Sequence, residues 1–538
     1  MRKFRDSSEN FMQGVFALMF SQIIIKILGL IYSLYLTNKE GFGDSGNAIY
    51  YSGFQIYALL LTLSSIGIPN AISKLVSEKL AVKDYNSANR IFKVAFVLFA
   101  IIGGIGSFIL FFGAGFISKV VLQIPEAEYT LVALSPSIFF VAISAVIRGY
   151  FAGRQNMDPT AKSQIIEQVF KATLTILFVE IIAILSNVNT KLMAAGANLA
   201  TSLATIVSFI YIYTLFIKDR IKENKRIKKE KKFEKERIKK IIYNIFCVSI
   251  PISLSSLLSA INKNIDSITV VRILKPILGE EIAKAKYGIL SAKVDVLTNL
   301  PLAFNIAFAT SLVPAIAAAK VKNDNRTINE RIRFSILTTI IIGLPCTIGM
   351  CMYSQEILSL LYPKASTGSM LLKISSFTII FTVLAQTING VLQGLGKVKV
   401  PAIALACGVF VKFLTNIILI PMESVYEYGA AIGSVLCHLV SYAIVYNVLK
   451  RTINLDFKMR NLIVKPIFAT LCMAVVSYLV FLALSIFNLG KLATIIAILI
   501  AVIVYFHMVI ILHIFSTEDL KTLPNGEKIV KFFKKYNY

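Results

Sequence analysis

Long apolar runs separated by short polar segments form the pattern of this chain. About 20 consecutive apolar residues in helical form cross a hydrocarbon core of about 30 Å. The pattern therefore predicts an all-α polytopic membrane protein. Fourteen runs qualify, and their expected spans are 11–36, 47–71, 94–118, 129–152, 163–186, 192–217, 241–274, 287–318, 334–361, 369–394, 401–419, 429–449, 461–486 and 492–516.

Composition supports this prediction, since 56% of the residues are hydrophobic, only 16% are charged and the mean hydropathy is +0.74. A soluble protein of 538 residues would need a larger polar surface. The basic N-terminal sequence MRKFRDSSEN precedes an apolar run that reaches Leu36 without a small-residue cleavage site. This start predicts a first membrane helix and not a removable signal peptide.

The positive charges are concentrated on one side of the predicted helices. With the N-terminus inside, the inner segments and tails hold 39 Lys and Arg residues, whereas the outer loops hold 8. This asymmetry predicts that both termini are cytoplasmic. The densest basic segment, 218–240, has 13 basic and 5 acidic residues, and it predicts a cytoplasmic linker attracted to anionic lipids. Regulatory or nucleic-acid binding is the weaker alternative, and no nucleic-acid partner is expected.

Two halves of the chain resemble each other. The segments 135–153 and 376–394 align without a gap, share six identities in nineteen, and keep two glycines in register. The same offset of 241 residues relates Lys171 to Lys412. A parallel repeat of six helices follows, and such repeats place a substrate site between two lobes that rock against each other. The expected parts are 1–217 (first lobe), 218–240 (linker), 241–450 (second lobe), 451–516 (two further helices, a surface for a lipid tail) and 517–538 (cytoplasmic tail).

Catalytic and metal motifs are missing from the sequence. The six cysteines lie singly in apolar runs, and the three histidines lack a carboxylate or cysteine at ligand spacing. This pattern indicates neither disulfides nor a zinc site. The chain is therefore expected to be a transporter without a cofactor and not an enzyme.

Charges inside the predicted spans are the candidate site residues. Nine are basic and five are acidic, so a wet cavity lined by them favours an anionic substrate such as a pyrophosphate group. A structural network of ion pairs is the competing explanation. Glu167 and Lys171 are four residues apart and Lys263 and Asp266 three apart, so each pair can meet on one helical face. The candidate cavity residues are Lys26, Arg148, Arg272 and Lys293, and the candidate coupling or ion-pair residues are Asp266, Asp295, Glu167 and Lys171.

Several motifs resemble the polysaccharide-transport branch of the MOP exporter superfamily, and most closely its lipid II flippases of the Gram-positive type and the related stage V sporulation protein B. The motifs are SQIIIKILGLIY (21–32), SSIGIPNAISKLVSE (64–78), IRGYFAGRQNMDPTAKSQIIEQVFK (147–171), YGILSAKVDVLTNLP (287–301), SLVPAIAAAK (311–320) and INGVLQGLGKVKVP (388–401). The resemblance implies a MOP/MATE-like fold of two six-helix lobes around a V-shaped cationic cavity. It also implies that helices 13 and 14 form a groove for an undecaprenyl chain.

The family's site residues carry over in part. Lys26 stands at a basic position before the LG of helix 1, and Asp295 matches an acidic position before the LP of helix 8. Two further basic positions of Gram-negative members are Tyr32 and Val296 here. The implied activity is the flipping of an undecaprenyl-pyrophosphate-linked cell-wall precursor, foremost lipid II, from the inner to the outer leaflet by alternating access.

Other functions stay open at this point. A flippase for another polyprenyl-linked polysaccharide unit fits the same motifs, and a cation-coupled multidrug exporter of the superfamily would need a net acidic cavity. A membrane glycosyltransferase would need a long extracytoplasmic loop. The expected partners are the lipid-linked glycan pyrophosphate and anionic membrane lipids, with the cell-wall synthesis machinery as a further candidate. The membrane potential, Na⁺ and H⁺ are all open as the source of coupling.

The orientation can be tested by single-cysteine labelling in intact cells. In a background without the six native cysteines, Glu230→Cys in the basic linker should resist an impermeant maleimide added outside, because the positive-inside asymmetry places this linker in the cytoplasm. Labelling should become rapid after the membrane is permeabilised. Rapid labelling in intact cells would reverse the predicted orientation.

Overall fold

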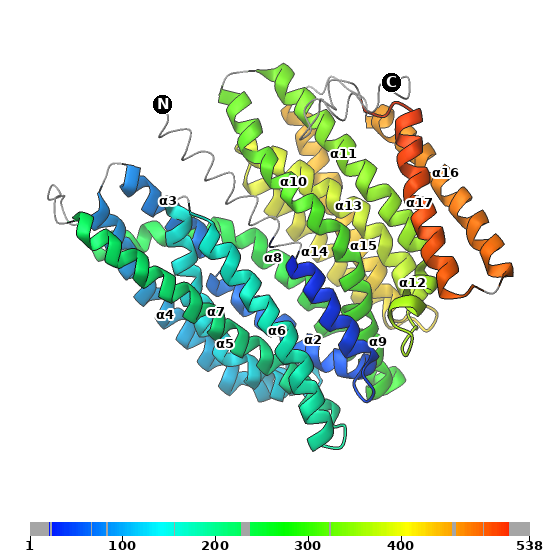
Figure 1. Cartoon of the computed structure of the whole chain (residues 1–538), viewed down its shortest axis with the longest axis horizontal. Coiled ribbons are helices and arrows are strands. Elements are labelled where there is room, and N and C mark those ends of the chain that lie inside the picture. The colour runs from blue at the N-terminus through cyan, green and yellow to red at the C-terminus, as the bar shows by residue number, and fades with distance from the viewer. Residues whose placement is uncertain are drawn as a thin grey trace. The chain divides into compact units, whose positions relative to one another are not determined.

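A computed structural model describes residues 21, 24–65, 67–81, 84–154, 156–227, 237–321, 324–453, 459–487 and 489–515. All regular structure in these residues is helical (Figure 1). After a first helix, Ile24–Asn38, the α-helices are α2 Gly43–Ser65, α3 Gly67–Ala81, α4 Tyr85–Phe116, α5 Ala127–Gly153, α6 Asp158–Leu185, α7 Thr190–Ile227, α8 Ile238–Leu278, α9 Glu280–Gly288, α10 Asp295–Val321, α11 Asn325–Met352, α12 Ser354–Leu361, α13 Ser369–Gly394, α14 Lys399–Leu419, α15 Tyr428–Thr452, α16 Met459–Ile486 and α17 Lys491–Ile511. Two π-helical turns, η1 Ile117–Leu122 and η2 Ile289–Val294, adjoin α4 and α10.

Ten of the described helices are long and apolar enough to cross a membrane. This confirms the multi-pass, all-α class, while the count of fourteen and the orientation stay predictions. The other predicted spans meet different elements. The first described helix is 15 residues long, and the expected span 47–71 is shared between α2 and α3. The span 287–318 is shared between α9, η2 and α10, whereas 241–274 lies within the single helix α8. Within the 218–240 linker, α7 continues through residue 227 and α8 begins at residue 238, whereas residues 228–236 and the tail 517–538 lie outside the described residues.

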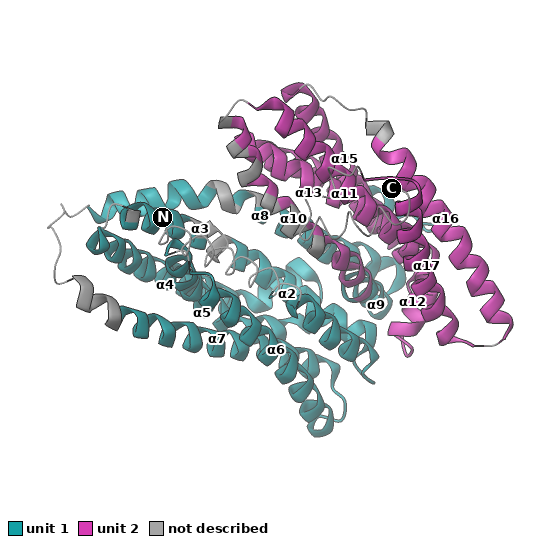
Figure 2. Cartoon of the chain, turned by 45° about the horizontal axis from the view of Figure 1, so that its top comes forward, with its two compact units in different colours: residues 1–292, 416–426 teal, residues 293–415, 427–538 magenta. Residues whose placement is uncertain are grey.

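The chain forms two compact units (Figure 2). Unit 1 comprises residues 1–292 and 416–426, and unit 2 comprises residues 293–415 and 427–538. These units differ from the lobes expected from the repeat, because α8 lies in unit 1, where it packs against α2, α3 and α9. The boundary between the two packed units therefore lies just after α9, and not in the basic linker.

The internal repeat is visible in how its shared glycines pack. A Cβ atom at Gly149 of α5 would lie 2.8 Å from the backbone of Pro69, and one at Gly153 would lie 2.8 Å from the Ser73 carbonyl oxygen of α3. In unit 2, a Cβ atom at Gly390 of α13 would overlap the Ala309 carbonyl oxygen of α10. In both units, glycine thus lets two helix backbones approach closely, as small residues do in membrane bundles.

The last two helices, which were predicted to lie outside the repeat, belong to unit 2. There α16 packs on α11 and α17, and α17 also contacts α12. The Tyr505 hydroxyl of α17 donates a hydrogen bond to the Ile341 carbonyl of α11 at 2.8 Å. The outer faces of the pair are apolar and exposed, for example at Leu479 and Ile503. A lipid-tail groove on these helices stays a prediction.

The glycine contacts can be tested by substitution. Gly390→Ala should lower the stability of the detergent-solubilised protein by about 1 to 3 kcal/mol, because the methyl group would overlap the Ala309 carbonyl. Gly349→Ala is the matched control, since a Cβ atom there meets nothing within 4 Å and alanine favours the helix by about 0.5 to 1 kcal/mol. In thermal unfolding, the melting temperature should be lower than that of the wild type for Gly390→Ala and higher for Gly349→Ala. Equal stability of both variants would show that the close approach is not needed.

Candidate functional site

Two lysines of unit 1 present charge to solvent without a carboxylate partner. Lys26 of the first helix and Lys263 of α8 are both exposed, and they are close enough for their charges to repel each other. Within the described part of the chain, neither side chain makes an ion pair or hydrogen bond. Surrounding protein nevertheless shields Lys26 from bulk water. This pair is therefore an accessible concentration of positive charge that attracts anions.

Arg272 also lies on α8, but on the opposite face from Lys263. Leu254, which is 47% exposed, precedes Arg272 by 18 residues, or about five turns of 3.6 residues. Lys263 lies halfway between them and thus about half a turn away around the axis. Arg272 consequently shares the apolar exposed face of Leu254, close to the end of α8 at Leu278. There a long side chain extends toward the interface, so the structure does not bring Arg272 together with Lys26.

Arg148 is held within unit 1 by neighbouring polar groups. Its guanidinium donates to Glu167 at 2.8 Å, to Ser163 at 3.2 Å and to Ser208 at 3.1 Å. The carboxylate of Glu167, which the sequence paired with Lys171, is thus engaged by an arginine from α5. This ion pair is only slightly exposed, and its hydrogen bonds connect helices α5, α6 and α7. It therefore leaves little uncompensated charge for a ligand.

Lys171 lies over aromatic rings instead of beside Glu167. Its Nζ atom is 4.2 Å from the centroid of the Phe54 ring and 5.2 Å from that of Tyr32. The side chain is 7% exposed. A cation over a ring face is attracted by the ring quadrupole. The helix spacing suggested a contact with Glu167 and could not show that rings of the first helix and α2 cover Lys171.

Asp266 is buried, and it makes a polar contact with the segment 416–426, which also belongs to unit 1. Asn416 donates to the Asp266 carboxylate at 3.0 Å and to the Thr269 hydroxyl at 2.9 Å. Both Asp266 and Asn416 are at most 5% exposed. Within the described residues, no group of three or more His, Cys, Asp or Glu side chains is arranged to hold a metal ion.

Lys293 and Asp295 occupy the start of unit 2. Lys293 has no exposed surface and donates to the Ala365 carbonyl at 2.6 Å, while its Nζ atom lies 5.9 Å from the Tyr362 ring. The Asp295 backbone carbonyl accepts a hydrogen bond from Asn299. Lys293 thus fastens the loop after α12 to the π-helical turn η2 in this conformation, and it lies apart from solvent.

The sequence pattern missed a cluster of charges around α9. Lys284 is 2% exposed, and its Nζ atom is 2.7 Å from Glu126, 2.7 Å from Glu280 and 3.5 Å from Glu281. Glu280 also pairs with Lys275 at 2.7 Å. Spacings of three and four residues on α9 signal the local pairs, whereas Glu126 comes from a distant segment before α5. The cluster therefore ties α9 to the start of α5.

This cluster shifts the protonation of its members. Hydrogen bonds from Lys275 and then from Lys284 hold the pKa of the Glu280 carboxylate below its ordinary value of 4.5. Burial disfavours the charged form of Lys284, but the hydrogen bonds that Glu126 and Glu280 accept outweigh burial and raise the pKa of its ammonium group. Both shifts favour the ion pairs over a broad pH range.

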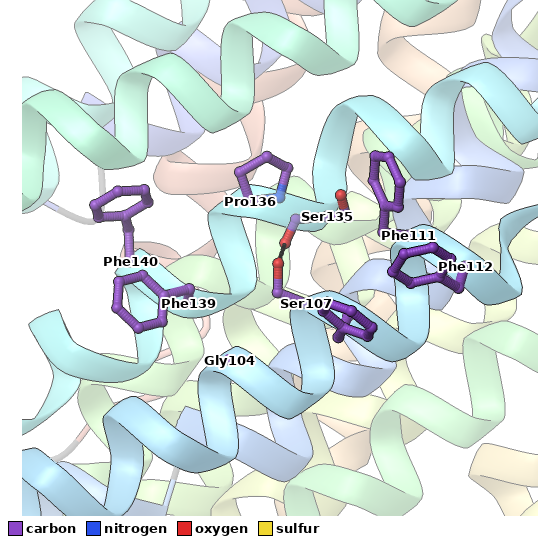
Figure 3. Close-up of a pocket in the computed structure, with 9 residues that line it drawn as sticks. Gly104, Ser107, Phe111, Phe112, Ser135, Pro136, Phe139 and Phe140 are labelled. Carbon is purple, nitrogen blue, oxygen red and sulfur yellow. Dashed lines mark hydrogen bonds between the residues drawn. The ribbon is translucent and has the colours of Figure 1, made fainter.

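An aromatic groove of about 420 Å³ lies between α4 and α5 (Figure 3). The Ser107 hydroxyl donates to the Ser135 carbonyl at 2.7 Å within it. Phe108 and Phe112 on its rim are about two-thirds exposed, and both helices qualify as membrane spans. The lining carries no charged side chain, so the groove suits hydrocarbon and not a diphosphate. Its other lining residues are Gly104, Phe111, Pro136, Phe139 and Phe140.

Two family models match this chain. The model described as "Polysaccharide biosynthesis protein" matches residues 11–320, and the model described as "Lipid II flippase MurJ" matches residues 221–503. Each match covers more than half of the chain, and together they extend over both units.

Relatives in Bacillus subtilis (strain 168) are similar over most of their length. The chain is 24% identical to the lipid II flippase MurJ over 465 residues, with 84% of each protein covered. It is 29% identical over 546 residues to the uncharacterized membrane protein YabM, covering 97% of this chain and 96% of that protein. It is 24% identical over 526 residues to stage V sporulation protein B, covering 96% and 98%.

Solved structures support the predicted fold. A lipid II flippase MurJ in an inward closed conformation superposes with a TM-score of 0.67 at 16% identity, covering 93% of this chain and 98% of that chain. An inward-facing multidrug resistance MATE family transporter of the MOP superfamily gives a TM-score of 0.62 at 14% identity, covering 80% and 94%. At such identities the likeness concerns the fold alone. The expected MOP/MATE-like fold is confirmed.

The Lys284 cluster gives a pH-dependent stability prediction. Lys284→Met should destabilise the solubilised protein by about 3 kcal/mol near pH 7, because it leaves carboxylates without their buried partner. The contribution of Glu280, whose pKa is lowered on folding, is present above about pH 4.5 and is lost as the pH falls through its folded-state pKa. That of Lys284, whose pKa is raised, is present below about pH 10.5 and is lost at higher pH.

Thermal unfolding of the wild type and the variant from pH 3 to 8 measures this difference. The gap between them should be largest near neutral pH and should narrow toward pH 3. Lys162→Met is the control, since Lys162 is 62% exposed and lies 3.8 Å from Asp158. Its effect should stay within about 0.5 kcal/mol. A constant gap for Lys284→Met across the pH range would exclude ion pairing as its cause.

Proposed function

The chain belongs to the polysaccharide biosynthesis protein and lipid II flippase MurJ families, and from this membership we propose that it flips a lipid-linked, pyrophosphate-bearing glycan. The first candidate cargo is undecaprenyl-pyrophosphate-linked lipid II, which would move from the inner to the outer leaflet of the bacterial cell membrane. The relative described as a lipid II flippase supports this choice. A flippase moves its cargo without breaking a bond, so catalytic residues are not required.

The observation that favours an anionic cargo is the exposed pair Lys26 and Lys263. Two unpaired lysines that repel each other raise the energy of the empty site, and an anion between them relieves that repulsion. Each phosphate oxygen can accept hydrogen bonds from an ammonium group, and such charge-assisted bonds are about twice as strong as neutral ones. A diphosphate supplies enough oxygens for both lysines.

Coupling is the second part of the proposal. The buried Asp266 carboxylate, held by Asn416, is the residue proposed to respond to Na⁺, H⁺ or the membrane potential. One elementary charge crossing a potential of 100 mV is worth about 2.3 kcal/mol. Movement of a charge coupled to the cargo could thus bias the direction of flipping toward the outer leaflet.

A cation-coupled multidrug exporter is the alternative. Similarity of fold to MATE transporters fits it. Such an exporter binds cationic amphiphiles and would be expected to present carboxylates to its cargo. The two exposed lysines favour the flippase over the exporter.

Replacement of a resident flippase tests the proposal. In cells that depend on this protein, lipid II accessible at the outer leaflet should reach normal levels. Normal growth with lipid II trapped inside would indicate another polyprenyl-linked glycan. Resistance to cationic dyes without any change in precursor lipids would favour the exporter.

Substitution of the lysine pair should remove transport while leaving the fold intact. Lys26→Ala should reduce outer-leaflet lipid II by at least tenfold at near-normal protein abundance, because the lysine is exposed and makes no hydrogen bond or ion pair in the described chain. Lys162→Ala, another exposed lysine, is the control and should retain transport. Activity that falls only in proportion to folded protein would assign Lys26 a structural role.

A further inference from the structure

We infer that Lys171 is a second binding residue for the diphosphate, placed near the middle of the bilayer. The inference rests on the proposed function, since it concerns the path of the same anionic cargo. It gives Lys171 a role in binding cargo, whereas the sequence indicated a coupling or ion-pair role.

The position of Lys171 along its helix points to the middle of the bilayer. It is residue 14 of the 28 residues of α6, and α6 is long and apolar enough to span the membrane. A lysine at such a depth costs roughly 2.5 to 3.5 kcal/mol on the insertion scale. Residues of this kind mark transport pathways in membrane proteins.

The contacts of Lys171 stabilise its charge but leave its hydrogen-bond donors unused. Its two aromatic neighbours, Phe54 and Tyr32, provide a cation–π interaction worth about 2 kcal/mol when desolvated. An ammonium group carries three donors. Within the described residues, Lys171 makes no hydrogen bond and no ion pair. These donors can bind the oxygens of an anion.

Lys284 shows how unit 1 compensates the charge of a structural lysine. It is the other buried lysine described in unit 1, and carboxylates contact it directly. A carboxylate also accompanies Arg148. Lys171, in contrast, is held by neutral rings, which an anionic ligand can displace at lower cost than a carboxylate.

The helix that carries Lys26 also contacts α6 beside Lys171. A Cβ atom at Gly29 would lie 3.8 Å from Gln168, and three residues further along each helix the Tyr32 ring lies beneath Lys171. The first helix and α6 therefore run in the same direction in this contact. Lys26 precedes Tyr32 by six residues, which is about 9 Å along the axis and about a third of a turn around it. A diphosphate bound at Lys26 would have to move both along and around the first helix to reach Lys171.

Phe54 covers the second position in this conformation. Its half-buried ring stacks on Tyr50 at 6.0 Å and lies 5.6 Å from the Tyr57 ring, so it belongs to an aromatic row on α2. An anion must replace this ring on the ammonium group. Arrival of the cargo at Lys171 would thus be coupled to a displacement of Phe54.

Binding of purified full-length protein to undecaprenyl diphosphate and to uncharged undecaprenol tests the inference. Lys171→Met keeps the length of the side chain and removes its charge, so it should weaken diphosphate binding at least tenfold without altering undecaprenol binding. Lys171→Arg should remain within a few-fold of the wild type. Lys412→Met is the matched control, because Lys412 is the buried repeat counterpart in unit 2, and it should bind like the wild type.

Phe54→Leu provides a test that leaves Lys171 in place. Loss of the ring face should strengthen diphosphate binding several-fold, since the ring no longer competes for the ammonium group. This variant still tests the inference if Lys171→Met does not fold. Unchanged or weaker binding by Phe54→Leu would contradict the inference, as would wild-type affinity of folded Lys171→Met.

The two proposals fail in different ways. If the wild type binds the diphosphate no better than undecaprenol, the proposed flippase function fails and this inference with it. If the wild type prefers the diphosphate but the Lys171 and Phe54 variants do not differ from it, only the role of Lys171 is overturned.

Discussion

The cost of a charge in hydrocarbon is the constraint on which the structure depends. Every cation placed between apolar helices needs a carboxylate, a set of carbonyls, an aromatic ring, water or a ligand. Unit 1 uses the first of these at Arg148 and Lys284 and the third at Lys171. Unit 2 uses carbonyl oxygens at Lys293. Structural cations are thus distinguished from candidate cargo cations by what compensates them, and not by their depth alone.

Apolar periodicity predicts the fold class of such a chain well. Of the fourteen helices predicted from the hydrophobic runs, ten are long and apolar enough in the structure to span a membrane. The glycines shared by the two halves indicated a repeat, and in both units these glycines lie at close helix contacts. The limits of α2, α3 and α8 were not predictable in the same way. The packing of α8 onto α2 and α3 depends on contacts between distant segments, which a local pattern does not contain.

The candidate site could also be predicted only where it depends on the local sequence pattern. The apolar runs placed these charges within predicted spans, and spacing along one helix paired Glu167 with Lys171, whereas the structure pairs Glu167 with Arg148 from another helix. The surplus of basic residues within the spans also grouped Arg272 with Lys26, although half a turn of α8 separates the faces of Arg272 and Lys263. Local spacing limits which partners are possible on one helix. The choice among helices is made by tertiary packing, where the geometry of a guanidinium fork favours a carboxylate and two hydroxyls at once.

A repeat can give equivalent positions different tasks. Lys171 and Lys412 occupy the same place in the two halves of the sequence, and both are buried. Lys171 lies over the rings of Phe54 and Tyr32, whereas Lys412 of α14 lies near the half-buried His438 of α15. The face of an aromatic ring attracts an ammonium group through its quadrupole. The two equivalent lysines therefore have different neighbours, and the two halves have diverged in how they compensate the same buried charge.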